Sequence, residues 1–266
     1  MLRKTMNLKL RNPLSVWRLF RSDVFRPSAA ILTVSVLGAC GTPENAGDVR
    51  DPFEAQNREV HEINRDLDRS IVRPVSQAYG TVVPEPVRRS IGNFSSNLDL
   101  PGIVLNDLLQ FKLGDAVNNT GRFLFNSTVG IAGLFDPATA IGIYERDADF
   151  GETLHTWGVG EGSYVELPLL GPSTERDAVG KIFDFAANPT RAFIPGDVRS
   201  AGTAASITDR VGDRYKFSDT VDSVLYESAD SYAQARLLYL QNRRYELGGV
   251  TGEPEYLDVY EDPYAQ

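Results

Sequence analysis

A long apolar stretch, RFLFNSTVGIAGLFDPATAIGIY (Arg122 to Tyr144), most restricts how this chain can fold. From residue 123 to 144 its only charge is Asp136, followed by Pro137, which leaves about 13 residues before the pair and about 7 after it. A helix of that longer part is about 20 Å long, which is less than the roughly 30 Å hydrocarbon core of a bilayer but more than one leaflet. We therefore predict an apolar helical hairpin bent at Asp136 and Pro137. It either lies among acyl chains in one leaflet or is buried in a soluble core.

The first forty residues have the pattern of a secretory signal, here assigned to residues 1–39. This segment contains seven Lys and Arg against one Asp, and its apolar run, AAILTVSVLGA, is too short to cross a bilayer. The run leads into LGAC, which resembles a bacterial lipobox with Cys40 as the acylated first residue of the mature protein. Acylation would explain a single cysteine in an exported protein. The alternative is a chance cysteine after the signal peptide of a soluble protein.

The remainder of the chain is strongly acidic. Without residues 1–39 it has 20 Lys and Arg against 35 Asp and Glu, a formal charge of about −15. Nucleic acids and anionic membrane surfaces attract clustered cations, so neither is favoured as a partner. Membrane contact should instead depend on apolar burial and the anchor. Gly41 stands where lipoproteins retained at the inner membrane have aspartate, so we expect a lipid-anchored protein on the periplasmic face of the outer membrane.

Helical periodicity, interrupted by proline and glycine, predicts a mainly α protein. Asp51 is a candidate cap for the first helix, which Pro74 should bend or end near residues 71–73. Pro101 should separate two helices, over 84–98 and 102–111. Residues 145–172 should be rich in loops, with a short strand over 164–167. The remaining helices are expected from Gly114 through Phe125, from a cap at Ser173, over 196–212 and, as the longest, over 219–247.

These elements predict one helical domain of short amphipathic helices over residues 51–248. A polar tether, residues 40–50, would join it to the acylated cysteine. An acidic flexible tail, residues 249–266, would follow it.

A few residues could carry chemistry. His155 has Asp149, Glu152 and Ser163 nearby in sequence, which keeps a lipid or peptidoglycan hydrolase as an alternative function. The chain has no G-x-S-x-G nucleophile motif, so a structural histidine is the favoured interpretation. With two histidines and one cysteine in the chain, we expect no metal site and no cofactor. The acidic helix residues Asp99, Asp107 and Asp115 are expected to be solvated or to cap helices.

Several stretches follow one another behind the lipobox: DPFEAQNREVHEINRDLD (51–68), NFSSNLDLP (93–101), RFLFNSTVGIAGLFD (122–136) and DFGETLHTWGVGEGSYVELPLLGPSTERD (149–177). Together they resemble the MlaA/VacJ family of outer-membrane lipoproteins, over roughly residues 51–184. The resemblance implies a ring-shaped helical domain embedded in the inner leaflet of the outer membrane. It also implies that mislocalised phospholipid passes from the outer leaflet through an amphipathic channel to a soluble periplasmic carrier. A trimeric porin would accompany the protein, and no covalent chemistry would be involved.

The resemblance also places the apolar hairpin beside the channel, where it gates the channel or contacts the porin. The membrane-embedded or gating residues would then be Phe123, Phe125, Val129, Ile131, Leu134, Phe135, Asp136 and Pro137. A phospholipid headgroup needs polar groups as well. The candidates for a polar wall, which approximate one helical face, are Arg176, Asp177, Lys181 and Asp184. A solvated helix side is the alternative for these four, and a structural envelope lipoprotein is a third possible function.

Overall fold

The computed structural model describes residues 50–190 and 194–248. The chain divides into two compact units, Met1–Gly41 and Thr42–Gln266, and all described residues belong to the second. The predicted signal peptide, Cys40, nearly all of the tether and the acidic tail lie outside the described residues. Among the helices that are described, none combines the length and the hydropathy that a membrane crossing requires.

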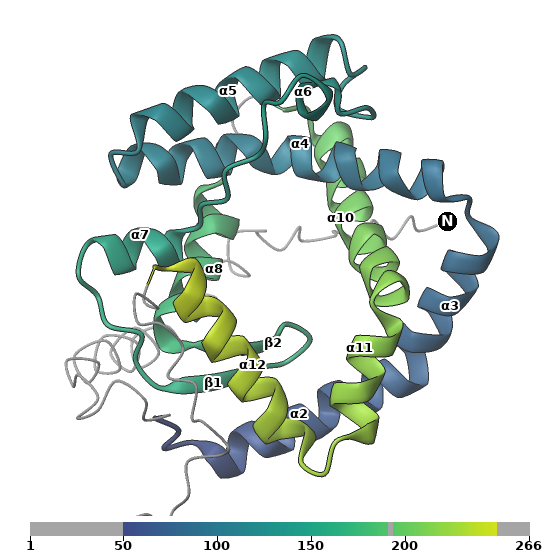
Figure 1. The fold of residues 1–266 in the computed structure, drawn as a ribbon, viewed down its shortest axis with the longest axis vertical. Helices are drawn as coiled ribbons and strands as arrows, with labels where there is room; N and C mark the ends of the chain where they lie inside the picture. Colours follow the sequence, from purple (N-terminus) through teal and green to yellow (C-terminus); the bar gives the residue numbers. More distant parts are fainter. Residues whose placement is uncertain (1–49, 191–193, 249–266) are drawn as a thin grey trace, which may run out of the picture. The chain divides into compact units, whose positions relative to one another are not determined.

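Helices make up most of the described structure, which confirms the predicted mainly α fold (Figure 1). The segments η2 and η3 are π-helical, and β1 pairs antiparallel with β2. The strand predicted over 164–167 is confirmed. In chain order the elements are α2 (Glu54–Leu67), η2 (Asp68–Val72), α3 (Arg73–Val82), α4 (Glu85–Leu109), α5 (Leu113–Thr128), α6 (Pro137–Ala140), α7 (Phe150–Thr156), β1 (Tyr164–Leu167), β2 (Gly171–Thr174), α8 (Glu175–Ala187), α10 (Gly196–Lys216), α11 (Ser218–Asp222), η3 (Ser223–Glu227) and α12 (Ser231–Glu246).

The elements of the second unit pack on one another in a closed circuit (Figure 1). α2 continues through η2 into α3, which packs on α10; α10 packs on α4, and α4 on α7. α7 packs on α8, α8 on both strands, and β1 on α2, which closes the circuit. α12 connects η3 to β2, while α5 lies along α4. This arrangement brings residues far apart in sequence onto a common inner side.

The helical run changes direction between α2 and α3 in Figure 1, as predicted for Pro74, whereas Pro101 does not end a helix where the sequence predicted. Pro74 lies in the first turn of α3, directly after η2, where the N–H of Arg73 donates to the carbonyl of Asp68, five residues back. The wider π turn lets the helix pass the proline. Pro101 lies inside α4, so the predicted break there is wrong. Packing of α4 against both α5 and α10 offsets the hydrogen bond that this proline removes.

Asp51 does not cap the first helix, contrary to the prediction. The N-cap of α2 is Phe53, which makes no side-chain cap. The Asp51 carboxylate instead accepts hydrogen bonds from Asn57 (2.9 Å), from Tyr232 and from Arg236. Two of these donors belong to α12, so a residue that looks like a local cap serves a long-range contact.

Two further helix predictions need correction. The N-cap of α8 is Thr174, whose hydroxyl accepts from the N–H of Asp177, rather than Ser173. The long helix predicted over 219–247 is interrupted at residues 228–230, and Asp230 caps α12 by accepting from the N–H of Ala233 at 3.0 Å. Aspartate favours the N-cap position, so Asp230 marks a possible helix start in the sequence. The apolar periodicity on both sides of Asp230 led instead to the prediction of one continuous helix.

Gly180 sets the distance between α7 and α8. A Cβ there would lie 2.5 Å from the backbone nitrogen of Gly151, which cannot move aside alone. We expect Gly180→Ala to lower the free energy of unfolding by about 1–3 kcal/mol. Gly121→Ala is the control, because its Cβ would meet none of the described atoms within 4 Å, and it should raise this free energy by about 0.5–1 kcal/mol. Urea unfolding followed by circular dichroism measures both, and equal effects would contradict the close contact.

Candidate functional site

The predicted apolar hairpin is a tight loop after α5 rather than a pair of helical arms. α5 ends at Thr128. Gly133 then lies against α4, because a Cβ there would be 2.5 Å from the Cβ of Asn97. The prediction of a 13-residue helical arm is therefore wrong: successive left-handed residues cannot continue a right-handed helix. These residues, with φ of 54°, 57° and 87°, are Ile131, Ala132 and Gly133.

Asp136 anchors the loop to α5. Its carboxylate accepts hydrogen bonds from Arg122 (3.1 Å), Asn126 (2.9 Å) and the Thr139 hydroxyl (2.6 Å), and it caps α6. Burial alone would raise the pKa of Asp136, but the hydrogen bonds from Thr139 and Asn126, with the charge of Arg122, hold it below its ordinary value. The one charge of the apolar stretch therefore fixes the position of the loop.

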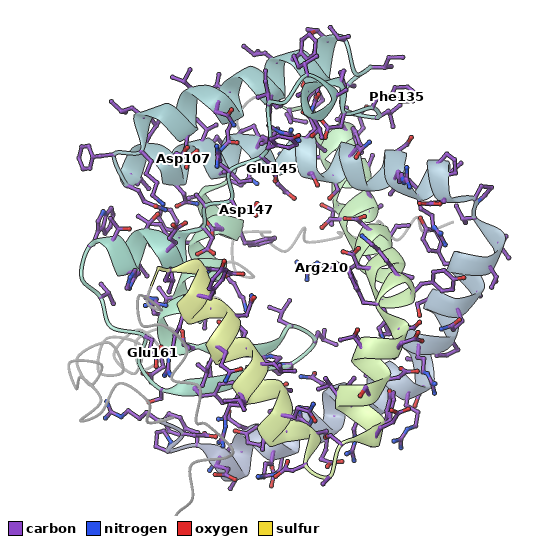
Figure 2. The ribbon with its side chains drawn as sticks, viewed as in Figure 1. Asp107, Phe135, Glu145, Asp147, Glu161 and Arg210 are labelled. Carbon is purple, nitrogen blue, oxygen red and sulfur yellow. The ribbon has the colours of Figure 1, made fainter. Side chains whose placement is uncertain are left out.

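The apolar side chains of this loop are largely exposed. Phe135 is 55% exposed and Ile131 60%, while Phe123 and Phe125 are half-buried on α5 and Pro137 is half-buried in α6. Figure 2 shows Phe135 directed away from the circuit of helices. The protein thus does not bury this stretch in a soluble core. Further exposed apolar residues of α5 and the loop are Val117, Leu124, Val129, Leu134 and Ile141.

Acidic groups gather on the inner side, where the loop returns to the circuit. Figure 2 shows Glu145 and Asp147 there, below α4. Burial raises the pKa of Glu145 to about 7, and the charges of Asp147 and Asp99 add to the rise, whereas Arg122 opposes it. The Nη2 of Arg122 lies 3.6 Å from the Glu145 carboxylate. Its positive charge offsets only part of the cost of burying the carboxylate charge.

The raised pKa makes the stability of the fold depend on pH. Because folded Glu145 binds its proton more tightly than the unfolded chain does, its contribution is fully present below about pH 4.3 and is lost as pH rises through about 7. We expect Glu145→Gln to raise the free energy of unfolding at pH 8 and to change it little at pH 4. Asp115→Asn is the control, because the side chain of this α5 residue is 43% exposed. Denaturant titrations at the two pH values test this, and a pH-independent effect would contradict it.

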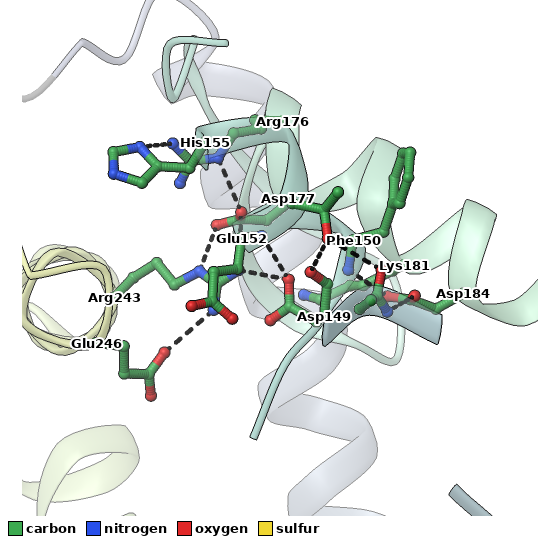
Figure 3. A network of polar contacts seen from close by, with 12 residues as sticks. Asp149, Phe150, Glu152, His155, Arg176, Asp177, Lys181, Asp184, Arg243 and Glu246 are labelled. Atoms are coloured by element: carbon green, nitrogen blue, oxygen red, sulfur yellow. Dashed lines mark hydrogen bonds and ion pairs between the residues drawn. The ribbon is translucent and has the colours of Figure 1, made fainter. Parts of the chain in front are cut away.

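A buried ionic network joins α7, α8 and α12 (Figure 3). Arg243 of α12 donates to Asp149 at 2.7 Å and to both carboxylate oxygens of Asp177 at 3.2 Å. Tyr239 (2.7 Å) and Arg176 (3.2 Å) complete the shell of Asp177. Burial would raise the pKa of Asp177, but the hydrogen bond from Tyr239 and the charge of Arg243 lower it. Sequence reasoning missed Arg243, which is far from its partners along the chain.

The four residues of the predicted polar wall have different environments. Arg176 and Asp177 are buried, 5% and 3% exposed, in the network just described. Asp184 is half-buried and accepts from Asn106 (2.8 Å) and from the N–H of Phe150 (3.0 Å). Lys181 is exposed. Asp177, Lys181 and Asp184 line a pocket of about 200 Å³ beside α12, so their role in lipid passage stays a prediction.

The described geometry does not assemble the hydrolase suggested by His155 and Ser163. The Nδ1 of His155 lies 3.4 Å from the Arg176 guanidinium, and burial together with that charge lowers the pKa of His155. Ser163 is buried and its N–H donates to Glu175. Among the described residues no hydrogen bond joins His155 to Ser163, and no cluster of His, Cys, Asp or Glu could hold a metal.

His61 shows a triad-like arrangement that sequence proximity did not indicate. Its Nε2 lies 3.0 Å from the Ser231 hydroxyl, and its Nδ1 lies 3.5 Å from the Glu166 carboxylate. All three are at most 8% exposed, and Arg65 also donates to Ser231. We interpret the group as a structural link between α2, β1 and α12, because a buried hydroxyl cannot meet a substrate.

Comparisons with known proteins agree on one family. A family model described as MlaA lipoprotein matches residues 49–246. The "Intermembrane phospholipid transport system lipoprotein MlaA" of Shigella flexneri is 32% identical over 91% of this chain and 94% of its own, and that of Escherichia coli is 31% identical over the same shares. A solved structure described as "Structural basis for maintenance of bacterial outer membrane lipid asymmetry" matches with a TM-score of 0.64 and 31% identity, covering 74% of this chain and 98% of its own.

Proposed function

The chain belongs to the MlaA lipoprotein family, and on that premise we propose that it removes mislocalised phospholipid from the outer leaflet of the outer membrane. The lipid passes through an amphipathic channel of the helical domain to a soluble periplasmic carrier, which preserves the difference between the leaflets. A trimeric porin is its partner in the membrane. Phospholipid is cargo in this process, and the protein performs no covalent chemistry.

The exposed apolar surface of α5 and its following loop is the observation that carries this proposal. Soluble monomers rarely expose large contiguous apolar surfaces, and such surfaces mark binding to membranes or partners. Phe135, Ile131 and Leu124 are all more than half exposed. The backbone of α5 satisfies its own hydrogen bonds, so this helix can lie in a leaflet without leaving polar groups unpaired.

The pockets on the inner side of the circuit have a mixed lining instead. They are lined by charged groups next to apolar ones, for example Asp147, Glu152 and Arg243 beside Ile103 and Leu247 in a pocket of about 450 Å³. A phospholipid combines a charged head with apolar tails and requires both kinds of lining. An apolar outer surface and a mixed inner surface therefore suit a protein that passes lipid through a leaflet.

Deleting the gene and measuring phospholipid in the outer leaflet tests the proposal. We expect externally accessible phospholipid to rise in the deletion strain and to return to normal when the intact chain is supplied. Unchanged accessibility would contradict the proposal and favour a structural lipoprotein. Loss of activity in a His155→Ala or Ser163→Ala variant that folds normally, with a hydrolytic product in wild-type cells, would favour the hydrolase.

Cys40 provides the proposed anchor. Stable attachment by lipid takes two membrane signals, and here the acyl chains would add to the apolar loop surface. We expect Cys40→Ala to move the protein out of the outer-membrane fraction, either to the soluble fraction or to a precursor stalled at the signal. Thr42→Ser is the matched control beside the processing site. If Cys40→Ala and the control are found in the outer-membrane fraction in equal amounts, Cys40 is not the membrane anchor and the assignment as a lipoprotein is contradicted.

A further inference from the structure

A pocket of about 820 Å³ lies between α4, the end of α8 and α10. This volume is within the range of about 300–1,000 Å³ that is typical of small-molecule sites. Its walls are mixed: Leu98 and Ile207 contribute apolar surface, and Ser200, Thr203 and Ser206 contribute hydroxyl groups. The pocket can therefore contact both a polar group and the apolar chain attached to it.

Asp99 of α4 brings a carboxylate to this pocket, and Arg199 and Arg210 of α10 bring guanidinium groups. The side chains of Asp99 and Arg210 form no ion pair or hydrogen bond with the described residues, and both are exposed to solvent. The surrounding walls raise the pKa of Asp99 to about 6, against the opposing effect of Arg210. Figure 2 shows Arg210 pointing into the space that the circuit of helices encloses. Both charges are thus available to a ligand.

The two charges are held on rigid elements. Gly202 is buried where α10 packs on α4, and a Cβ there would clash with the Leu98 side chain. Gly92 makes a second close approach, because its Cβ would lie 2.5 Å from the carboxylate of Asp209. The spacing of Thr203, Ser206 and Arg210 places them on one face of α10. The close packing of α4 and α10 therefore forms two walls of the pocket, and Asn188, Thr190 and Ile194, between α8 and α10, contribute to its lining.

We propose that this pocket receives the headgroup of a zwitterionic, amine-bearing phospholipid, with Arg210 on the phosphodiester and Asp99 on the ammonium. This inference rests on the phospholipid transport proposed above and adds the headgroup class. A guanidinium matches the oxygens of a phosphate in a bidentate geometry. Ser206 can add a hydroxyl donor to the same oxygens, whereas the hydroxyls of Ser200 and Thr203 donate to the carbonyls of Asp197 and Arg199. A headgroup without an amine would leave Asp99 facing added negative charge, which disfavours it.

A competition between two lipids with identical acyl chains tests the headgroup site. The full acylated protein in detergent is mixed with equal amounts of phosphatidylethanolamine and phosphatidylglycerol, and the bound lipids are measured by mass spectrometry. We expect wild type to retain the amine-bearing lipid preferentially. Asp99→Asn should abolish the preference, and Arg210→Gln should reduce binding of both lipids about tenfold. Lys216→Gln, an exposed cation of the same helix outside the pocket, should change neither quantity.

The results distinguish a failure of the headgroup site from a failure of the proposed transport function. If wild type binds phospholipid but Asp99→Asn and Arg210→Gln bind it with unchanged amount and preference, the headgroup site is wrong and transport stands. If wild type binds no phospholipid, the proposed function itself fails. Soluble glycerophosphoethanolamine is added as a competitor without tails. If it displaces the lipid at equal concentration, the pocket takes a free phosphoester, and the lipid assignment is overturned.

Discussion

Replacing Arg243 by Met is expected to lower the free energy of unfolding by about 3–5 kcal/mol. The Arg243 side chain is 13% exposed and the Asp177 side chain 4%. Without the guanidinium, Asp177 keeps Tyr239 and Arg176 but loses the cation that joins it to Asp149. An incompletely compensated buried carboxylate is costly, whereas the matched volume of Met limits the loss of packing. Urea unfolding at pH 7 measures the change.

Two further variants decide whether burial of charge causes this loss. Arg89→Met removes a cation that pairs with Glu85 while 73% exposed, so its cost should be about 0–1 kcal/mol. Combining Arg243→Met with Asp177→Asn should recover part of the stability, because the buried charge then disappears with its partner. Equal losses for Arg243→Met and Arg89→Met, or strictly additive effects in the double variant, would contradict the network as drawn in Figure 3.

Local features of the fold were predictable from sequence, and long-range uses of the same residues were not. The strand over 164–167 and the helical character of the chain follow from local patterns. Asp51 and Pro101 show the opposite case. Asp51 has the sequence of a cap but binds α12, and Pro101 has the sequence of a break but lies in a helix supported on two sides. Tertiary contacts determine both the role of Asp51 and the continuation of the helix through Pro101. Such contacts cannot be read from the local pattern of a single sequence.

The candidate site was predictable to a similar extent. The apolar stretch around Phe135 was identified from its composition, and its exposure agrees with a membrane role. The predicted helical shape of this stretch was wrong, because apolar periodicity does not reveal the residues with positive φ that begin at Ile131. Arg243 was missed, since its partners Asp149 and Asp177 are distant in sequence and no local pattern reports the contact. Arg210 was missed because only the fold places it in a pocket with Asp99. The family resemblance was identified from short motifs and is confirmed by the family match.

Placing a charge at Phe135 is expected to reduce phospholipid transport at least tenfold while leaving the fold intact. Moving a carboxylate into hydrocarbon costs about 2.5–3.5 kcal/mol by insertion measurements, and each 1.4 kcal/mol corresponds to about tenfold. Phe135 is 55% exposed, so Phe135→Asp removes little internal packing. The Cys40 anchor should still deliver the variant to the outer membrane, so the defect would be in transport rather than targeting. Complementation of the deletion strain, read as accessible outer-leaflet phospholipid, measures it.

Tyr245→Asp provides the matched control, because Tyr245 is 73% exposed on α12, away from the apolar surface of α5. It should complement normally, and so should Phe135→Leu, which keeps an apolar side chain. Depth can be read independently by replacing Phe135 or Tyr245 with Trp in bilayers whose acyl chains carry bromine. Only the tryptophan at 135 should be quenched beyond the background of Trp157. Equal quenching at both positions, or full complementation by Phe135→Asp, would show that the loop does not lie among acyl chains.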